Sequence, residues 1–198
     1  DGPLTPELYQ VLEKLAAQSS IPIKRCPLEQ NRGLGLALQY GVLQCQYDII
    51  ARMDTDDIAV EDRFEQQFDL MEKENLALLG GHIAEFIDQP DEIVSYRRVP
   101  TKHEEIVAYQ RMRSAFNHMT VMFKKEMVLK AGNYEDGLYM EDDLLWLNMI
   151  SAGARTGNVD QILCKVRVGA GMFERRGGLR YLKLYRQARQ RMHARGQI

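Results

Sequence analysis

The chain of 198 residues is 45% apolar and 27% charged, which is typical of a soluble globular protein with one well-packed domain. No apolar run approaches the length of a membrane span, which argues against a transmembrane protein. The cysteines, Cys26, Cys45 and Cys164, lie far apart and form no metal-ligand pattern or evident disulfide framework. These features predict a reducing compartment such as the cytoplasm.

The formal net charge of −2 hides an asymmetry along the chain. Most acidic residues lie in the first two thirds, whereas the stretch from Lys165 onward is rich in arginine and contains Glu174 as its single acid. A basic tail of this kind predicts an anionic partner, which could be phosphate, a membrane surface or nucleic acid.

Helix and strand signals alternate along the chain. Thr5, Pro6 and Glu7 form a typical helix start, and Thr101 with Glu104 matches a capping box. Helices are expected over residues 5–19, after the turn at 31–35, and over 62–74, 101–113, 124–131, 141–153 and 179–194; strands are expected over 21–24, 49–53, 76–79, 82–87, 119–123 and 162–168. This alternation predicts an α/β domain whose sheet is mainly parallel and becomes mixed in its second half.

Most aromatic residues in these helices are expected in the core. Phe64, Phe68 and Met71 share one helical face of the segment 62–74, and Trp146 lies in the apolar pattern of the segment 141–153. A role as sugar-stacking platforms is a weaker interpretation for them than burial.

Three carboxylates occupy the turn Asp54–Asp57, directly after the expected strand 49–53. Like charges this close repel one another, so the cluster is costly unless a cation lies among them, and hard divalent cations prefer carboxylate oxygens. Carboxylates at the carboxyl end of a strand also lie where open α/β sheets bind ligands. A metal site and a solvated acidic turn both fit this stretch.

A second group of acids, Glu141, Asp142 and Asp143, stands at the start of the segment 141–153. N-capping and the helix dipole explain one or two acids at such a place. At least one carboxylate is then left without a structural task, and it could act as a general base toward a hydroxyl. The structural and the catalytic interpretation both remain open on these residues alone.

The turn Asn31–Gly35 leads into a helix, and glycine-rich turns at helix starts can approach phosphate or ribose closely. However, Gly33 and Gly35 do not complete a dinucleotide fingerprint, and no acid follows at the required distance. Taken alone, this stretch is better explained as a plain turn.

Together these motifs resemble the family 2 glycosyltransferases, which have the GT-A fold, and the resemblance covers nearly all of the chain. Asn31-Arg32-Gly33 looks like the segment before the family's metal site, and Asp54-Thr55-Asp56 looks like its Asp-x-Asp motif, which Asp57 extends. Asn117-His118 resembles the part that lines the acceptor side.

The second half of the chain carries the same resemblance. Gly132-Asn133-Tyr134, Glu141-Asp142 and Leu145-Trp146-Leu147 look like the family's Gly-Gly-Tyr, Glu-Asp and Leu-Trp-Leu motifs, in the same order. The stretch 167–178 is similar to a subset of the family that makes bacterial capsular polysaccharides and exopolysaccharides.

The resemblance implies an inverting enzyme that moves a sugar from a UDP- or GDP-sugar to a hydroxyl of a polysaccharide or lipid-linked acceptor. Asp54 and Asp56 would hold Mn²⁺ or Mg²⁺, which would neutralise the departing diphosphate, and Asp142 would be the catalytic base. The other residues expected at the nucleotide-sugar are Asp1, Asn31, Arg32, Gly33 and Thr55, with His118 and Glu141 on the acceptor side.

The start of the chain departs from the family pattern. Asp1-Gly2 looks like the tail of an Asp-Asp-Gly-Ser segment, with Pro3 where serine is usual, and there is no initiator methionine. This predicts a GT-A domain over residues 1–178 that is truncated at its N-terminal strand and therefore binds donor poorly by itself. Residues 179–198 are assigned to a separate basic amphipathic helix.

Basic residues near the end of the chain have two interpretations each. Arg175 and Arg176, on a glycine-flanked stretch, could close over the donor diphosphate, or could belong to a solvated or membrane-facing loop. For the helix 179–194, docking on the domain with a solvated basic face is favoured over peripheral contact with the inner face of the plasma membrane.

Two other functions fit part of the pattern. A nucleotidyltransferase-like enzyme also uses an acidic pair and Mg²⁺, but its second carboxylate joins the metal site, whereas Asp142 should stand clear of the metal. A non-catalytic module that binds anions or nucleic acid would explain the basic tail. The acidic centre and the shortage of aromatic residues among the tail's arginines argue against it, so no nucleic-acid partner is expected.

Overall fold

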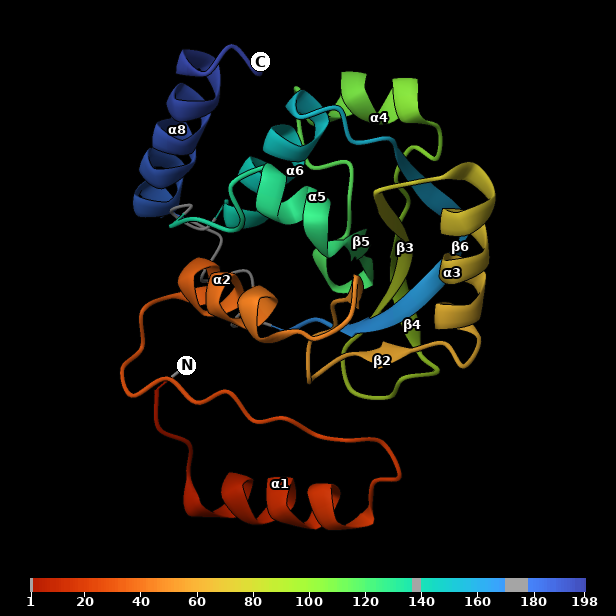
Figure 1. Ribbon diagram of the computed structural model, residues 1–198, viewed down its shortest axis with the longest axis vertical. Coiled ribbons are helices and arrows are strands. Elements are labelled where there is room, and N and C mark those ends of the chain that lie inside the picture. The colour runs from red at the N-terminus through yellow and green to blue at the C-terminus, as the bar shows by residue number, and fades with distance from the viewer. Residues whose placement is uncertain (1, 137–139, 170–177) are drawn as a thin grey trace.

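The computed structural model describes residues 2–136, 140–169 and 178–198. A central sheet is flanked by helices on both faces, while α1 lies apart from the body and α8 lies along one side (Figure 1). The helices are α1 Pro6–Gln18, α2 Leu34–Gln44, α3 Arg63–Glu74, α4 His103–Gln110, the 3₁₀ turn η1 His118–Thr120, α5 Lys125–Lys130, α6 Glu141–Ser151 and α8 Gly178–Ala194. The strands are β1 Ile49–Ala51, β2 Ile58–Ala59, β3 Leu78–Phe86, β4 Ile93–Arg97, β5 Met122–Lys124 and β6 Thr156–Arg167.

The sheet has the strand order β1-β5-β3-β6-β2, with β4 also paired to β3. The long pair β3–β6 is parallel, from Leu78 opposite Thr156 to Phe86 opposite Arg167. The pairs β1–β5, β5–β3, β3–β4 and β2–β6 are antiparallel. The α/β class and the mixed sheet are therefore confirmed, but the expectation of a mainly parallel sheet is wrong for the described strands. One reason is that links such as residues 87–92 are too short for a crossover and return the chain as a hairpin.

Strand β3 runs straight through Gly80 and Gly81, where the sequence predicted a break between two strands. A Cβ atom on Gly81 would clash with the side chain of Leu163, and one on Gly80 would clash with Asn158. The two glycines therefore let β6 side chains pack directly over the β3 backbone, which is a known use of glycine within a strand.

Two apolar layers cover the two faces of the sheet. Leu78 and Phe123 point into the larger core around Trp146, which holds residues of α2, α4, α5 and α6. Their neighbours Leu79 and Met122 point to the other side, toward Met71 of α3. This alternation follows from the period of two in a strand, and it confirms the expected burial of Trp146.

Helix α3 is rotated relative to the expected orientation. Met71 is buried as predicted, but Phe64 and Phe68 are 56% and 48% exposed, so their assignment to the core is wrong. Arg63 and Gln67 are buried instead. Their side chains donate to backbone oxygens, Arg63 Nη2 to Arg52 at 2.8 Å and Gln67 Nε2 to Thr120 at 2.8 Å, so the helix satisfies backbone groups next to the strands that an apolar face would leave unpaired.

The ends of the chain differ in how they pack. Helix α1 is capped by Thr5 as predicted, but none of its residues is buried, and the segment 21–24 is not a strand. Helix α4 begins at His103 without a side-chain cap, so the expected capping box is absent. Helix α8 buries Ala188 and Met192 against α6, as expected for a docked helix. Within the described residues, no helix is both long enough and apolar enough to cross a membrane.

The rotation of α3 can be tested by a matched pair of alanine substitutions. Met71→Ala should lower the free energy of unfolding by about 2–5 kcal/mol, because it removes a fully buried side chain. Phe68→Ala removes a larger but half-exposed side chain and should cost less than about 1 kcal/mol. Urea unfolding of both variants measures the difference, and a larger loss for Phe68→Ala would contradict this packing.

Candidate active site

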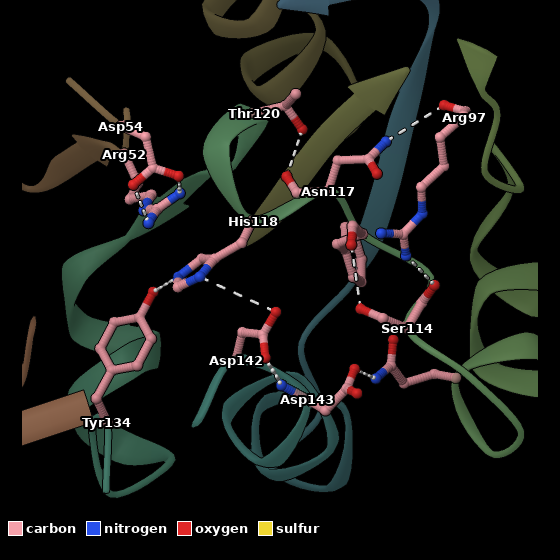
Figure 2. A network of polar contacts seen from close by, with 12 residues as sticks. Arg52, Asp54, Arg97, Ser114, Asn117, His118, Thr120, Tyr134, Asp142 and Asp143 are labelled. Carbon is pink, nitrogen blue, oxygen red and sulfur yellow. Dashed lines mark hydrogen bonds and ion pairs between the residues drawn. The ribbon is translucent and has the colours of Figure 1, made fainter. Parts of the chain in front are cut away.

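The acidic turn after β1 begins with an ion pair. Arg52 Nη1 lies 2.7 Å from Asp54 Oδ2, and its Nη2 contacts the other carboxylate oxygen (Figure 2). The Arg52 side chain is 9% exposed and that of Asp54 36% exposed, so the guanidinium lies beneath the turn and the carboxylate at its surface. This two-point contact fixes Asp54 and balances its charge.

The other acids of the turn have different environments. Thr55 and Asp56 are exposed and form no hydrogen bond or ion pair with the described residues. Asp57 accepts a hydrogen bond from the backbone N–H of Arg167 at 3.1 Å, which joins the turn to the end of β6. Partial burial raises the pKa of Asp57 to about 6, with repulsion from Asp54 and Asp56 as a smaller contribution. Asp57 therefore has a structural task, and Asp56 is available for a ligand.

The donor set of the turn suits a hard cation, because Asp54 and Asp56 offer carboxylate oxygens. In the described part of the chain, no group of three or more His, Cys, Asp or Glu side chains is arranged to hold a metal. A metal at this turn would therefore rely on two carboxylates, with Asp54 shared with Arg52, and on ligands from outside the protein.

Next to the turn, His118 of η1 lies between an aromatic hydroxyl and a carboxylate. Its Nε2 is 2.9 Å from Tyr134 Oη, and its Nδ1 is 4.0 Å from Asp142 Oδ2 (Figure 2). Burial lowers the pKa of His118 to about 3, and burial also raises the pKa of Tyr134. The imidazole is therefore neutral and the phenol protonated at physiological pH.

The three acids at the start of α6 differ in their burial and in their hydrogen-bond partners. Asp143 accepts a hydrogen bond from Gln110 Nε2 at 2.8 Å, and burial, with repulsion from Asp142, raises its pKa to about 6. Glu141 is buried, which raises its pKa. The Asp142 side chain is 22% exposed, and its Oδ1 accepts from the backbone N–H of Asp143 at 2.9 Å.

Asp142 is thus the member of this group that faces His118, and burial raises its pKa as well. None of the described lysines or arginines forms an ion pair with it. A partly exposed carboxylate with an increased proton affinity suits a general base.

The turn Asn31–Gly35 belongs to the same region. Asn31 Oδ1 accepts from the backbone N–H of Gly33 at 3.0 Å, and Gly33 has φ +89°, which favours glycine. A Cβ atom on Gly35 would clash with the carbonyl of Glu135 and press on the side chain of Glu141. The start of α2 therefore packs directly against the chain that leads into α6.

The expected site residues are in part brought together. Asp142 lies beside His118, which contacts Tyr134, and the charges of Asp142, Glu141 and Asp54 add to the effect of burial in raising the pKa of Tyr134. Asn31, Arg32 and Gly33 directly precede α2, whose Gly35 packs against Glu135 and Glu141. The expected site residues Asp1, Arg175 and Arg176 lie outside the described residues.

Sequence reasoning did not assign a role to Arg52 or Tyr134. Arg52 had a detectable signal, since it is a charged residue inside the apolar run that precedes the acidic turn. Tyr134 was noticed as part of a family motif, but its contact with His118 joins residues that the sequence does not pair.

Comparison with known proteins supports the resemblance found in the motifs. The family model described as "Glycosyl transferase family 2" matches residues 1–132. The chain is 44% identical to an uncharacterized glycosyltransferase of Haemophilus influenzae over 92% of this chain and 67% of that protein. It is 40% identical to the amylovoran biosynthesis glycosyltransferase AmsE of Erwinia amylovora, over 92% of this chain and 68% of the relative.

A third relative is named for its substrates. It is the UDP-Gal:alpha-D-GlcNAc-diphosphoundecaprenol beta-1,3-galactosyltransferase of Escherichia coli, at 36% identity over 91% of this chain and 65% of the relative. The chain therefore spans about two thirds of the length of these relatives.

Solved structures show the same fold at low identity. The Staphylococcus aureus TarS fragment 1-349, in complex with UDP-GlcNAc, has a TM-score of 0.67 at 14% identity, over 93% of this chain and 53% of that one. The mannosyltransferase PcManGT of Pyrobaculum calidifontis, in complex with GDP-Man and Mn²⁺, has a TM-score of 0.63 at 13% identity, over 86% of this chain and 47% of that one. These neighbours confirm the GT-A fold, and the sequence matches show that the chain belongs to glycosyl transferase family 2.

Proposed function

We propose that this glycosyltransferase moves a sugar, with inversion, from a UDP- or GDP-sugar to a hydroxyl of a saccharide or lipid-linked acceptor. The observation that carries the proposal is the division of the acids into two groups that belong to different parts of the fold. One is exposed at the end of β1, where Asp56 has no partner among the described residues, and the other presents Asp142 beside His118.

In the proposed reaction, the acceptor oxygen attacks the anomeric carbon from the face opposite the diphosphate. A new carbon–oxygen bond forms with the acceptor's electron pair, and the bond from the anomeric carbon to the diphosphate oxygen breaks. The diphosphate leaves with that bond's electrons, and the hydroxyl proton passes to Asp142. Attack from the opposite face inverts the configuration at this carbon.

The state of Asp142 supports its role as the base. Burial raises its pKa, so the carboxylate gains affinity for the proton that the hydroxyl loses during attack. Its side chain is still 22% exposed, which leaves a path for an acceptor. Glu141 and Asp143 are less suitable, because Glu141 is buried and Asp143 is bound by Gln110.

The exposed end of the acidic turn supports a role toward the donor. Asp56, with Asp54, would hold Mn²⁺ or Mg²⁺, which when bound neutralises charge on the nucleotide diphosphate. Arg52, which lies beneath the turn, keeps the carboxylate of Asp54 oriented. The packing of Gly35 against Glu141 supports a contact of the preceding residues Asn31, Arg32 and Gly33 with the donor.

Two relatives and two neighbours guide the choice of ligands. The Escherichia coli relative is named for a UDP-sugar and a diphosphoundecaprenol-linked acceptor, and AmsE for amylovoran biosynthesis. The neighbouring structures hold UDP-GlcNAc, or GDP-Man with Mn²⁺. Family membership disfavours the nucleotidyltransferase alternative.

The expected membrane contact through α8 and the cytoplasmic location stay predictions. α8 buries Ala188 and Met192 on the domain, while Leu179 and Leu182 are exposed, together with the basic residues Lys183 and Arg186. Such a surface would suit an anionic membrane that carries a lipid-linked acceptor.

Asp142→Asn should lower kcat by about 10²–10⁴-fold, because an amide cannot accept the hydroxyl proton. Donor affinity, measured by calorimetry, should stay unchanged. Asp143→Asn is the matched control on the same turn of helix; its amide oxygen can still accept from Gln110, and kcat should stay within about tenfold of the original. Near-normal turnover in Asp142→Asn would remove the base assignment.

Asp56→Ala should weaken Mn²⁺-dependent donor binding by about tenfold or more, which corresponds to about 1.4 kcal/mol. Binding without metal should change little, because the loss concerns the metal ligand. Asp69→Ala, at an exposed acid of α3 outside the site, is the control for a general change in charge. If calorimetry gives the same Mn²⁺-dependent affinity for Asp56→Ala and Asp69→Ala, the metal assignment is wrong.

A further inference from the structure

We propose that Tyr134 and His118 are positioning residues for Asp142. In this arrangement Tyr134 holds the neutral imidazole in one tautomer, with Nδ1–H directed at Asp142 Oδ2, and the pair thereby sets the pH range in which Asp142 can accept a proton. The inference rests on the proposed role of Asp142 as the base.

The three side chains come from separate elements and form a row. His118 starts the 3₁₀ turn η1, Tyr134 follows α5, and Asp142 lies in the first turn of α6 (Figure 2). The distances are 2.9 Å from Tyr134 Oη to His118 Nε2 and 4.0 Å from His118 Nδ1 to Asp142 Oδ2. Each nitrogen of the imidazole therefore has its own neighbour.

Packing holds the imidazole in this orientation. The ring of Trp146 meets that of His118 edge to face at 79°, with centroids 5.8 Å apart, and Trp146 is fully buried. Tyr134 is also buried, and its backbone is fixed at both polar groups: its N–H donates to Asn133 Oδ1 at 2.7 Å, and its carbonyl accepts from Gln39 Nε2 at 2.6 Å. The imidazole cannot exchange its two nitrogens without displacing these neighbours.

The choice of tautomer follows from the two neighbours. A neutral imidazole carries one proton, so one nitrogen donates and the other accepts. If the proton were on Nε2, the lone pair of Nδ1 would face the carboxylate of Asp142, and two acceptors would oppose each other. With the proton on Nδ1, the Tyr134 hydroxyl donates to Nε2 and Nδ1–H faces the carboxylate, so both contacts are attractive. Burial of Tyr134, which raises its pKa, keeps its hydroxyl protonated for this purpose.

The orientation of Asp142 also follows. Its Oδ1 accepts from the backbone N–H of Asp143 at 2.9 Å, and its Oδ2 faces His118. At 4.0 Å the contact with Nδ1 is longer than a direct hydrogen bond. The N–H group therefore acts on the carboxylate through its dipole or through one bridging water. Such a contact stabilises the carboxylate modestly and leaves Oδ2 able to receive a proton.

Other charges act on Asp142 and have to be kept constant in any test. Glu141 and Asp143 are acids on the same helix, and Arg52 after β1 and Arg97 of β4 are cations that favour the carboxylate. None of these groups is altered by changes at Tyr134 or His118, so a shift caused by those changes can be assigned to the imidazole.

The loss of the Nδ1–H dipole of His118 determines the direction in which the pKa of Asp142 changes. Without Nδ1–H, the Asp142 carboxylate is less stable and its pKa rises further, so the acid limb of the profile of kcat/KM against pH moves to higher pH. Tyr134→Phe and His118→Gln should each move this limb by about 0.5–1 pH unit, because the contact is indirect. His118→Asn should restore the original limb, since an asparagine amide can donate from a position near Nδ1, whereas a glutamine amide reaches the position of Nε2.

The test combines these pH profiles with a measurement that needs no turnover. The ¹⁵N spectrum of protein labelled at histidine, with His118→Gln used to assign the signal, should show the proton of His118 on Nδ1, and Tyr134→Phe should transfer population to Nε2. A proton on Nε2 in the unaltered protein would overturn the inference. So would a fall in kcat at all pH values without a shift of the acid limb, which is the result of a merely structural role.

The experiments distinguish a failure of this inference from a failure of the proposed function. If Asp142→Asn is inactive but the acid limb stays in place in Tyr134→Phe and His118→Gln, Asp142 remains the base and the positioning role is wrong. If Asp142→Asn is active, the base assignment itself fails, and with it this inference. Thermal unfolding of each variant confirms that the compared proteins are folded.

Discussion

The fold has to accommodate two clusters of carboxylates, one after β1 and one at the start of α6, although the like charges within each cluster repel one another. Three of the acids are matched by a specific neighbour: Asp54 by Arg52, Asp57 by the backbone N–H of Arg167, and Asp143 by Gln110. Burial raises the pKa of several of these groups, which reduces the charge that they carry near neutral pH. Asp56 is exposed without a partner among the described residues, and Asp142 is partly exposed beside His118. These are the two acids to which the proposed chemistry gives a task.

The surrounding fold explains how these neighbours are placed. The buried guanidinium of Arg63 donates to the carbonyl of Arg52, so α3 supports the residue that in turn fixes Asp54. Gly35 lets α2 approach Glu135 and Glu141 closely. Within the sheet, Gly80 and Gly81 let side chains of β6 pack against the backbone of β3.

Local signals in the sequence predicted much of this fold. The capping residue Thr5, the acidic turn after an apolar run and the acids at the start of α6 each depend on neighbours within a few residues. Predictions that depend on distant contacts were less successful. The helical face with Phe64 and Phe68 is exposed, because the carbonyls of Arg52 and Thr120 draw Arg63 and Gln67 inward. The expected break at Gly80 is absent. The glycine at this position makes room for a side chain of β6 and does not end the strand.

The same distinction holds for the site. The motifs predicted Asp54, Asp56, His118 and Asp142 as site residues by residue type and order, and the structure shows His118 in contact with both Tyr134 and Asp142. The pairing of Arg52 with Asp54 and the row from Tyr134 to Asp142 are tertiary contacts, and no local pattern encodes them. In the proposed mechanism, these contacts decide which of several adjacent acids acts, which the sequence left open.

The central claim is that the two acid groups have separate tasks, with the metal and donor at the end of β1 and the base at the start of α6. Crystals grown with Mn²⁺ and UDP or GDP would test this most directly through the anomalous signal of manganese. The account predicts a single strong peak within coordination distance of the Asp56 carboxylate, with Asp142 clear of the metal. A peak bound by Asp142 or Glu141, as in a site where both acid groups hold the metal, would contradict it.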